Sequence, residues 1–360
     1  MVDVGCRAEL FLRDADGRET SLSAVCRFCS SSRKRAASGS IANAASAKGL
    51  SYRHAWGVIA RNRGAAGRRA HHQIARARGS VLSELGESVL RAQRVCGERL
   101  EVPLHTVTND VAGELNQRLA GGVTQVRIHA SHGYAVATLV RALGEQRVPV
   151  DIKYRESAEA MSAFARGECE LAGFHLPIGE FRSTCADIYR PYLDQNKHQL
   201  IRLTRRTQGL FLPKGNPKRT SGLHDLARSN VCFVNRQPGS GTRMLLDLSL
   251  RSVGVDPDQI NGYATTELTH SAIAAFVASG MADLGFGVQP AAQHFALDFI
   301  PIIDEDYFFA CERTRLDEAR LASVLRILRS EGFTDSVVQL EGYDPARCGS
   351  LVDIDEGLRG

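Results

Sequence analysis

The sequence of 360 residues lacks any run of about 18 consecutive apolar residues, so no transmembrane helix is expected. Its first residues, MVDVGCRAELFLRDADG, contain early acidic residues and lack the basic start and apolar core of a signal peptide. The nine cysteines are scattered and odd in number, which fits reduced thiols rather than a disulfide framework. We therefore expect a cytoplasmic protein with no membrane partner.

The motifs of several enzyme classes are missing as well. Cys26-Arg-Phe-Cys29 has the C-x-x-C spacing, but no second pair completes a zinc site. The turn around Ser240 lacks the lysine of a phosphate-binding loop and the spacing of a hydrolase nucleophile elbow, and it is only a fragment of a dinucleotide fingerprint. The acidic run 304–306 could bind a metal, but we interpret it as a solvated turn. We expect no enzyme activity, no metal site and no cofactor.

Positive charge is concentrated in the first third of the chain. Residues 1–110 carry 18 Lys and Arg against 10 Asp and Glu, a net charge of +8, whereas the remaining residues carry 27 against 30. No acidic residue occurs between Glu19 and Glu84, where 12 basic residues are found. A basic region on a slightly acidic body is what binding to a phosphate backbone requires, although a basic tail would have the same composition.

Within this basic region, residues 40–61, SIANAASAKGLSYRHAWGVIAR, predict two short helices joined by a tight turn at Gly49. Ser51 is a good N-cap for the second helix, whose first residues would reach base edges in a helix-turn-helix. Arg53 can donate two hydrogen bonds to guanine. An ordinary helical hairpin would show the same pattern. The candidate DNA-binding residues are Ser51, Tyr52, Arg53, His54, Arg61 and Arg78.

GSIANAASAKGLSYRHAWGVI resembles the winged helix-turn-helix of molybdate-responsive regulators, which are similar to the LysR type in this part. The resemblance implies a DNA-binding domain over 1–82, in which 24–38 and 60–78 are atypical, and a linker helix over 83–124 that pairs two subunits of a homodimer. The atypical stretches lack the family's apolar pattern, and we interpret one or both as translated from a shifted reading frame. For 60–78 the alternative is a basic arm that binds phosphates. The apolar pattern of 83–100 fits equally well a surface helix that packs on its own domain. If the helix pairs two subunits, the candidate contact residues are Leu85, Val89, Ala92 and Cys96.

From residue 125 onward, short apolar strands alternate with helical patterns, which predicts a parallel α/β sheet. Such sheets bind ligands beyond the carboxyl ends of their strands, at helix starts. Ser131 and His132 follow the strand VRIHAS, and the Pro-Gly-Ser-Gly turn at 238–241 follows VCFVN. Helix starts expose unpaired N–H groups and favour anions, yet the second turn could equally be a plain connection capped by Ser240.

The predicted ligand-binding residues gather at these helix starts. A carboxylate at Glu267 would repel an anion unless protonated, so we favour a helix cap there; His132 could likewise be an N-cap neighbour with no ligand. Arg243 is the nearest fixed positive charge to the second helix start. The candidate residues are Ser131, His132, Ser240, Gly241, Thr242, Arg243 and Glu267.

HASHGYAVATLV, VNRQPGSGTR and TELTHSAIAAFVASGMADLGFG resemble the type II periplasmic-binding-protein-like domain found beside molybdate-type regulators and molybdopterin-biosynthesis proteins. The resemblance implies a two-lobed α/β domain over 125–350, with one lobe at about 125–200 and 298–345 and the other at about 205–295. It also implies a ligand in the cleft, molybdate or tungstate or a molybdenum-cofactor species. The resulting hypothesis is a DNA-binding transcriptional regulator that senses a small anion; the alternative is a ligand-binding protein of molybdate or molybdopterin metabolism without DNA binding.

Overall fold

The computed structural model describes residues 11–13, 19–21, 71–73, 80–82, 84–119 and 125–359. The chain divides at Leu100 and Glu101 into two compact units, the second of which contains the α/β domain. The predicted helix-turn-helix lies outside the described residues, and so does each candidate DNA-binding residue: Ser51, Tyr52, Arg53, His54, Arg61 and Arg78. The DNA-binding domain therefore stays a prediction.

The first unit contains two short antiparallel pairs and the beginning of a long helix. β1 (Phe11–Arg13) pairs with β2 (Glu19–Ser21), and β3 (His71–Gln73) pairs with β4 (Ser80–Leu82). Helix α4 (Glu84–Leu119) is 36 residues long and contains Pro103. It occupies the range of the predicted linker helix, and its role in dimer formation stays a prediction.

The α/β domain is built around one ten-stranded mixed sheet, whose main path runs β10-β9-β11-β8-β12-β7-β5-β6. Lobe 1 contains β5 (Val126–Ala130), which pairs in parallel with β6 (Val150–Tyr154) and β7 (Leu171–Pro177). Helices α5 (Tyr134–Glu145) and α6 (Ser157–Ala165) connect these strands. The lobe is completed by α7 (Arg182–Tyr189), α11 (Ala319–Leu328) and α12 (Glu331–Val338).

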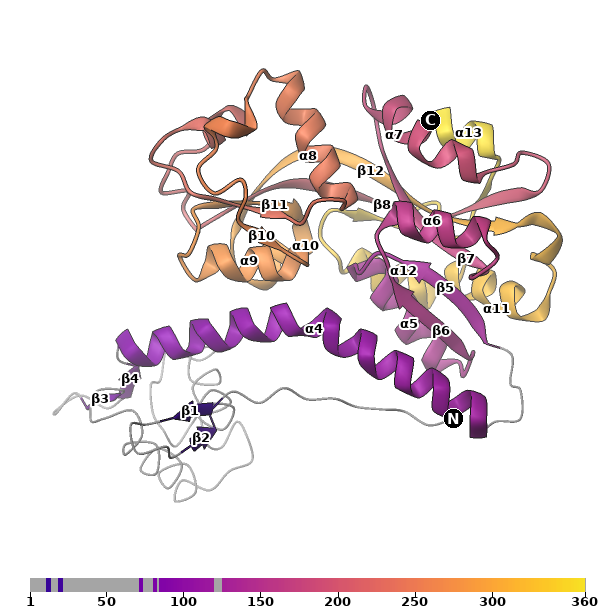
Figure 1. The fold of residues 1–360 in the computed structure, drawn as a ribbon, viewed down its shortest axis with the longest axis horizontal. Coiled ribbons are helices and arrows are strands. Elements are labelled where there is room, and N and C mark those ends of the chain that lie inside the picture. The colour runs from indigo at the N-terminus through magenta and orange to yellow at the C-terminus, as the bar shows by residue number, and fades with distance from the viewer. Residues whose placement is uncertain are drawn as a thin grey trace. The chain divides into compact units, whose positions relative to one another are not determined.

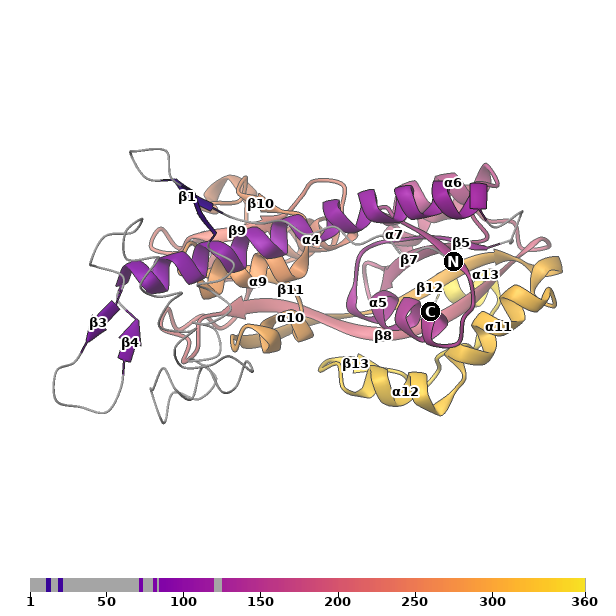
Figure 2. The same ribbon diagram turned by 90° about the horizontal axis from the view of Figure 1, so that it is seen from below.

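Two long strands link the lobes. β8 (His198–Leu212) and β12 (Asp298–Glu312) pair antiparallel along their length and run side by side through both lobes in Figures 1 and 2. The sequence pattern predicted a parallel sheet, but the sheet is mixed: β8 and β12 are antiparallel to their neighbours, whereas the strands within each lobe pair in parallel. Register shifts fall between Pro301 and Ile303 and between Tyr307 and Phe308, where the strand pair can bend.

Lobe 2 follows the same strand–helix alternation. It contains β9 (Phe233–Arg236), α8 (Gly241–Ser252), β10 (Thr266–Glu267), α9 (His270–Ala278), β11 (Leu284–Val288) and α10 (Gln289–His294). β9 pairs in parallel with β10 and β11. The carboxyl ends of β9 and β10 thus deliver the starts of α8 and α9 to one edge of the sheet.

The chain returns to lobe 1 after α12. β13 (Tyr343–Asp344) and β14 (Leu351–Val352) both pair with β8, and α13 (Ile354–Arg359) follows. The described 3-10 helices are η1 (Arg190–Tyr192), η2 (Leu223–Ala227), η3 (Pro257–Gln259) and η4 (Arg313–Arg315). The returning segment places Tyr343 opposite Arg206 of β8.

Separate apolar cores stabilise the two lobes. One cluster of lobe 1 joins β5 and α5 to α11 and α12 through residues such as Leu139 and Phe309. Another joins α6 and β7 to α7 and α13, including Phe174 and Tyr189. The lobe 2 cluster includes Phe233 and Phe286. Among the helices that the structure describes, none combines the length and apolar character needed to cross a membrane.

The acidic run 304–306 was expected to form a solvated turn, and this expectation is wrong. It lies within β12, and the residues Glu305 and Asp306 are only 2% and 3% exposed. Arginine side chains of β8 and α7 neutralise both carboxylates: Arg206 pairs with Glu305, while Arg182 and Arg202 pair with Asp306. A buried carboxylate needs such partners, and they lie more than 90 residues away in the sequence.

Candidate functional site

The start of α5 is the centre of the candidate site. β5 ends at the buried Ala130, and the chain turns through Ser131 and His132 into the helix. The N-cap position is Gly133, which has no side chain to accept a hydrogen bond, and the first turn contains no acidic residue. The helix dipole is therefore compensated neither by the side chain of its own N-cap residue nor by an acidic residue in its own first turn.

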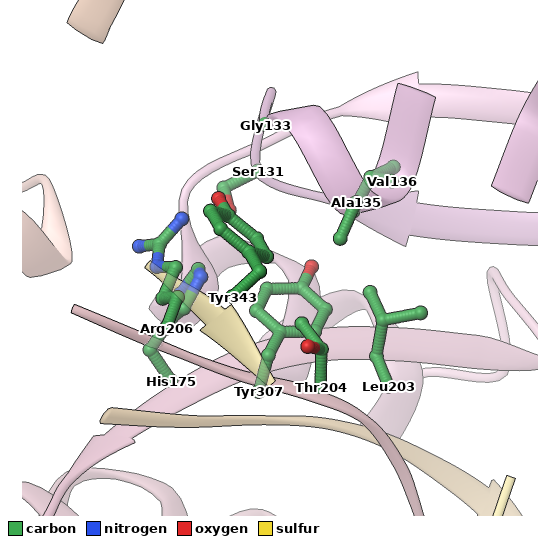
Figure 3. A pocket seen from close by; sticks show the side chains of 10 residues that line it. All are labelled: Ser131, Gly133, Ala135, Val136, His175, Leu203, Thr204, Arg206, Tyr307 and Tyr343. Carbon is green, nitrogen blue, oxygen red and sulfur yellow. The ribbon is translucent and has the colours of Figure 1, made fainter. Parts of the chain in front are cut away.

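A small cavity lies against this helix start, with a volume of about 10 Å³. Figure 3 shows its lining side chains, which come from lobe 1 and from the linking strands. That volume holds about one water molecule. A ligand larger than water therefore requires side chains or lobes to move apart. The lining residues are Ser131, Gly133, Ala135, Val136, His175, Leu203, Thr204, Arg206, Tyr307 and Tyr343.

Arg206 brings a fixed positive charge to the cavity. It lies on β8 and is 5% exposed, and one edge of its guanidinium group is held by the carboxylate of Glu305, which also accepts a 2.8 Å hydrogen bond from Gln208. Burial lowers the pKa of Arg206, but the Glu305 carboxylate and the Tyr343 hydroxyl together more than offset this effect and raise it, so the guanidinium stays charged. A Cβ atom built on Gly133 would lie 3.6 Å from Nη1 of Arg206. The other edge of the guanidinium therefore faces the start of α5.

His175 contributes a hydrogen-bond donor beside Arg206. Its ring on β7 packs edge-on against Tyr307, with centroids 4.1 Å apart. Burial, and then the charge of Arg206, lowers the pKa of His175 well below its usual value, so the imidazole is neutral. Its Nδ1 lies 3.3 Å from Oγ of Ser157. When Ser157 donates to Nδ1, the proton of the ring is on Nε2, a buried atom that has no partner among the described residues.

His270 of lobe 2 approaches the same region as the first residue of α9. Burial lowers the pKa of His270 well below its usual value, and Arg236, Arg206 and His132 lower it further. Its Nδ1 is buried, and within the described part of the chain no hydrogen-bond partner reaches it. A Cβ atom on Gly287 would lie 2.6 Å from this nitrogen, so the absence of a side chain at 287 makes room for the ring.

Arg236 is the second buried cation of the region and lies at the end of β9. It is 6% exposed, and its guanidinium donates to the carbonyl oxygen of Leu268 and, over 3.4 Å, to the carboxylate of Glu156. Burial lowers the pKa of Arg236, an effect that Glu156 offsets and Arg206 reinforces. Its Nε atom is buried without a partner in the described residues. Lobe 2 therefore presents a desolvated positive group to lobe 1.

Side chains from the two lobes already touch at this position. The Tyr134 hydroxyl of α5 lies 2.8 Å from Oγ of Ser271 in α9. Gln237, which follows β9, donates a 3.0 Å hydrogen bond to Glu156 at the N-cap of α6. The starts of α5 and α9 thus face each other across the cleft, with arginine side chains on both walls.

Three of the predicted ligand residues, Ser131, His132 and Glu267, lie on the elements described above. Ser131 lines the small cavity, and His132 packs edge-on against Tyr154 with ring centroids 5.0 Å apart. Glu267, 4% exposed, lies on β10 directly opposite Arg236 in the parallel register. The roles of these residues in ligand binding stay predictions.

The start of α8 is arranged differently. Ser240 is 1% exposed; its hydroxyl accepts a 3.2 Å hydrogen bond from the backbone N–H of Arg243 and donates to the carbonyl oxygen of Gln237 at 3.0 Å. Gly241 is the first residue of the helix, and Thr242 is buried. The structure therefore shows the capped turn, one of the two alternatives for this motif, and anion binding here stays a prediction.

Arg243 is not among the residues that line the small cavity. Its Nε donates to the carboxylate of Asp247 at 3.0 Å, and its guanidinium stacks 3.9 Å over the ring of Tyr263. An open cavity of about 270 Å³ lies on this side of α8. It is lined by Pro238, Gly239, Arg243, Met244, Asp247, Leu248 and Arg251.

Sequence reasoning missed Arg206, Arg236, His175 and His270. A signal existed for two of them: Arg206 interrupts the apolar run of β8, and His175 interrupts that of β7. A charged or titratable residue inside a buried strand needs a partner or a function. The other two occupy a strand end and a helix start, where polar residues are common.

The described ranges contain no group of three or more His, Cys, Asp or Glu side chains that could hold a metal ion. Burial raises the pKa of the Cys169, Cys185 and Cys311 thiols to about 12. These thiols are therefore protonated and poor metal ligands.

Comparison with known proteins agrees with this architecture. Residues 140–329, more than half of the chain, match the family described as PBP superfamily domain. The uncharacterized protein YvgK of Bacillus subtilis is 36% identical over 200 residues, 56% of this chain; the chain spans 64% of that relative, less than two thirds of its length. An uncharacterized protein of Clostridium pasteurianum, encoded in the 5′ region of a 2Fe-2S ferredoxin gene, is 33% identical over 110 residues, 30% of this chain and 97% of its own.

Solved structures with a related arrangement include the tungstate ABC transporter of Geobacter sulfurreducens (12% identity, TM-score 0.43, covering 60% of this chain and 98% of that one). A phosphate transport receptor of Vibrio cholerae (15%, 0.44, 61% and 99%) and the full-length regulator LysG of Corynebacterium glutamicum (14%, 0.39, 88% and 96%) are others. These scores are too low for the ligands or roles of those proteins to be transferred. On the match over 140–329 and the two-lobed fold, the chain belongs to the PBP superfamily and carries its ligand-binding domain.

Proposed function

We propose that the PBP-like domain binds a small oxyanion between its lobes, at the start of α5, and that this binding regulates the protein. One observation carries the proposal: Nη1 of Arg206 faces a helix start that has no side-chain cap, beside the unpartnered Nε2 of His175. All of these groups are hydrogen-bond donors or positive poles, and they converge on one cavity. An acceptor with negative charge satisfies them together.

The balance of donors and acceptors supports an anion over a neutral or cationic ligand. Burial raises the pKa of Tyr307, so its hydroxyl stays protonated and can donate. The Nε atom of Arg236 adds a donor from lobe 2. A buried donor without a partner costs about 1–3 kcal/mol, so a ligand rich in acceptor oxygens recovers that loss at several groups at once.

For the identity of the anion we propose molybdate or tungstate, or a molybdenum-cofactor species. This choice rests on the resemblance of HASHGYAVATLV and VNRQPGSGTR to the binding domain of molybdate-type regulators. Sulfate, phosphate and small carboxylates satisfy the same donors, so the test compares them directly.

The regulatory part of the proposal is a DNA-binding homodimer that acts by binding rather than catalysis. Its support is the acid-free, basic stretch between Glu19 and Glu84 and the helix-turn-helix pattern at 40–61. Selection from a random DNA duplex library by the full chain, followed by mobility shifts with and without molybdate, tests it. Enrichment of one sequence supports a regulator; only salt-sensitive binding to all sequences favours the alternative, a ligand-binding protein of molybdate or molybdopterin metabolism.

The ligand site is tested by placing a carboxylate at the start of α5. Gly133 has an extended backbone (φ −170°, ψ 159°), which any residue can adopt, and a new Cβ there has room. In Gly133→Asp the side chain would cap α5 beside Arg206, stabilise the ligand-free protein by roughly 1 kcal/mol and compete with the ligand. Gly133→Asn has the same shape without the charge and is the matched control.

Thermal unfolding with molybdate, sulfate and phosphate at equal ionic strength measures both effects. We expect an anion to raise Tm in the wild type; at about 100 times its Kd it adds about 2.7 kcal/mol. Gly133→Asp should lose this response and Gly133→Asn should retain part of it. If both variants respond like the wild type, the anion does not bind at α5. If no anion raises Tm in the wild type, the inorganic-oxyanion proposal fails.

A further inference from the structure

Glu156 is a carboxylate of lobe 1 that pairs with Arg236 of lobe 2. It occupies the N-cap of α6 in lobe 1, where the helix dipole favours a negative charge. Its Oε1 accepts hydrogen bonds from Nε2 of Gln237 at 3.0 Å and from Nη2 of Arg236 at 3.4 Å, both of which belong to lobe 2. The Glu156 side chain is 23% exposed and that of Arg236 only 7%. The Glu156 carboxylate thus lies on the solvent side of the desolvated Arg236 cation.

The contact with Arg236 is loose. The distance of 3.4 Å is long for a charge-assisted hydrogen bond, whose usual length is about 2.7–2.9 Å. Nε of Arg236 remains without a partner in the described residues. Glu156 thus satisfies the charge of Arg236 only in part, and a better-placed anionic group would bind this guanidinium more strongly.

We propose that Glu156 is a built-in competitor of the ligand: in the ligand-free protein it holds Arg236 and keeps the lobes together, and an acidic group of the ligand takes its place. This inference rests on the proposed anion site. It makes Glu156 a determinant of affinity and specificity, since only a ligand that binds Arg236 better than Glu156 does can displace it. Such a ligand carries acceptor oxygens toward Arg206 and Arg236 together, as a compact dianion or a small dicarboxylate does.

The energetic consequence follows from linkage. The free energy of the Glu156–Arg236 contact is lost when the ligand enters, so it is subtracted from the binding free energy. Removing the charge of Glu156 weakens the contact in the ligand-free state and leaves the ligand-bound state with one less repulsive carboxylate. Both effects act in the same direction, toward tighter anion binding.

The test compares Glu156→Gln with Glu159→Gln. Glu159 lies on the same helix. Its side chain is 65% exposed and pairs with Arg155 over a long distance of 4.0 Å, so its replacement makes the same change in net charge at an exposed position. Calorimetric titration of the full chain with molybdate, sulfate, phosphate and malonate measures the affinities. We expect Glu156→Gln to bind the preferred anion about tenfold more tightly and Glu159→Gln to stay within about twofold of the wild type.

A measurement without ligand separates this inference from the proposed function. Hydrogen exchange of the backbone amides at the starts of α5 and α9 should accelerate in Glu156→Gln but not in Glu159→Gln, because the lobes separate more often. Unchanged exchange, or anion binding that is equal or weaker in Glu156→Gln, overturns the role of Glu156. Faster exchange with no response to any of the four anions supports the contact between the lobes and rejects the anion proposal alone.

Discussion

The starts of α5 and α8 both expose the first N–H groups of a helix at the edge of the sheet, but the two are capped differently. Each follows a strand that ends at the edge of the sheet, and each contains a glycine and a serine. At α8 the serine is the N-cap, and its hydroxyl satisfies the backbone. At α5 the N-cap is Gly133, and Ser131 lies against a cavity with Arg206.

The difference shows what makes a helix start available to a ligand. The dipole and the first N–H groups are the same at both helices, but at α8 the protein has compensated part of them internally. Arg243, the cation beside α8, is also satisfied, by Asp247 and by the ring of Tyr263. A helix start therefore predicts an anion site only where its N-cap side chain and its nearest cation are not already paired within the protein.

The largest expected contrast is between the arginines of the two helix starts. Arg206→Met leaves Glu305 buried without its cationic partner, although the hydrogen bond from Gln208 remains, and we expect it to lower the free energy of unfolding by roughly 3–5 kcal/mol. Arg243→Met removes a partly exposed pair and a stacking contact, and we expect a loss of about 1 kcal/mol. Urea denaturation of both variants measures these losses. Equal losses would contradict the contrast.

A pH titration should separate the helix starts next. His270 beside α9 and α5 is neutral in the folded protein because its pKa is lowered, whereas the unfolded chain takes up its proton below about pH 6.5. Stability therefore falls as pH falls, by about 1.4 kcal/mol per pH unit for this one group. His270→Gln should remove that share of the slope between pH 6.5 and 5.

The control for this titration is His224→Gln, which changes an exposed histidine of lobe 2. This variant measures what the replacement of one histidine outside the cleft does to the slope. If His270→Gln keeps the full slope, then the imidazole is protonated in the folded state, and the cleft already holds a positive charge there.

Much of the fold was predictable because its strands and helices are short-range patterns. The strands at 126–130 and 150–154 and the helices between them follow from apolar periodicity alone. The length of β8 was not predictable, because Arg202, Arg205 and Arg206 interrupt its apolar run. The partners of these arginines, Glu305 and Asp306, lie in a strand about 100 residues later. Local sequence cannot show that a charge is neutralised at such a distance.

The candidate site was predictable only in its backbone. Ser131 and the helix start that follows it were identified from the strand–helix alternation. Arg236 and His270 were not, because they reach the cleft through the pairing of β9 with β10 and the missing side chain at Gly287. These are relations between segments, and a single sequence carries no signal for them.

A smaller contrast is expected between the serines. Ser240→Ala removes the α8 cap and should cost about 1 kcal/mol of stability without changing anion affinity. Ser131→Ala should leave stability nearly unchanged and weaken anion binding about fivefold, since it removes one hydroxyl from the cavity wall. Thermal unfolding with and without molybdate gives both numbers for each variant. Loss of the anion response in Ser240→Ala instead would move the ligand to α8.

The smallest effect concerns the hydrogen bond between the starts of α5 and α9. Tyr134→Phe removes the hydroxyl that lies 2.8 Å from Ser271, and Ser271→Ala removes the other partner. Each change should lower stability by about 0.5–1.5 kcal/mol, and the double variant should cost little more than either alone, because both delete the same bond. Additive losses measured by urea denaturation would mean that the hydroxyls act separately. The contact between the lobes at this position would then depend on the hydrogen bonds that Glu156 accepts from Arg236 and Gln237.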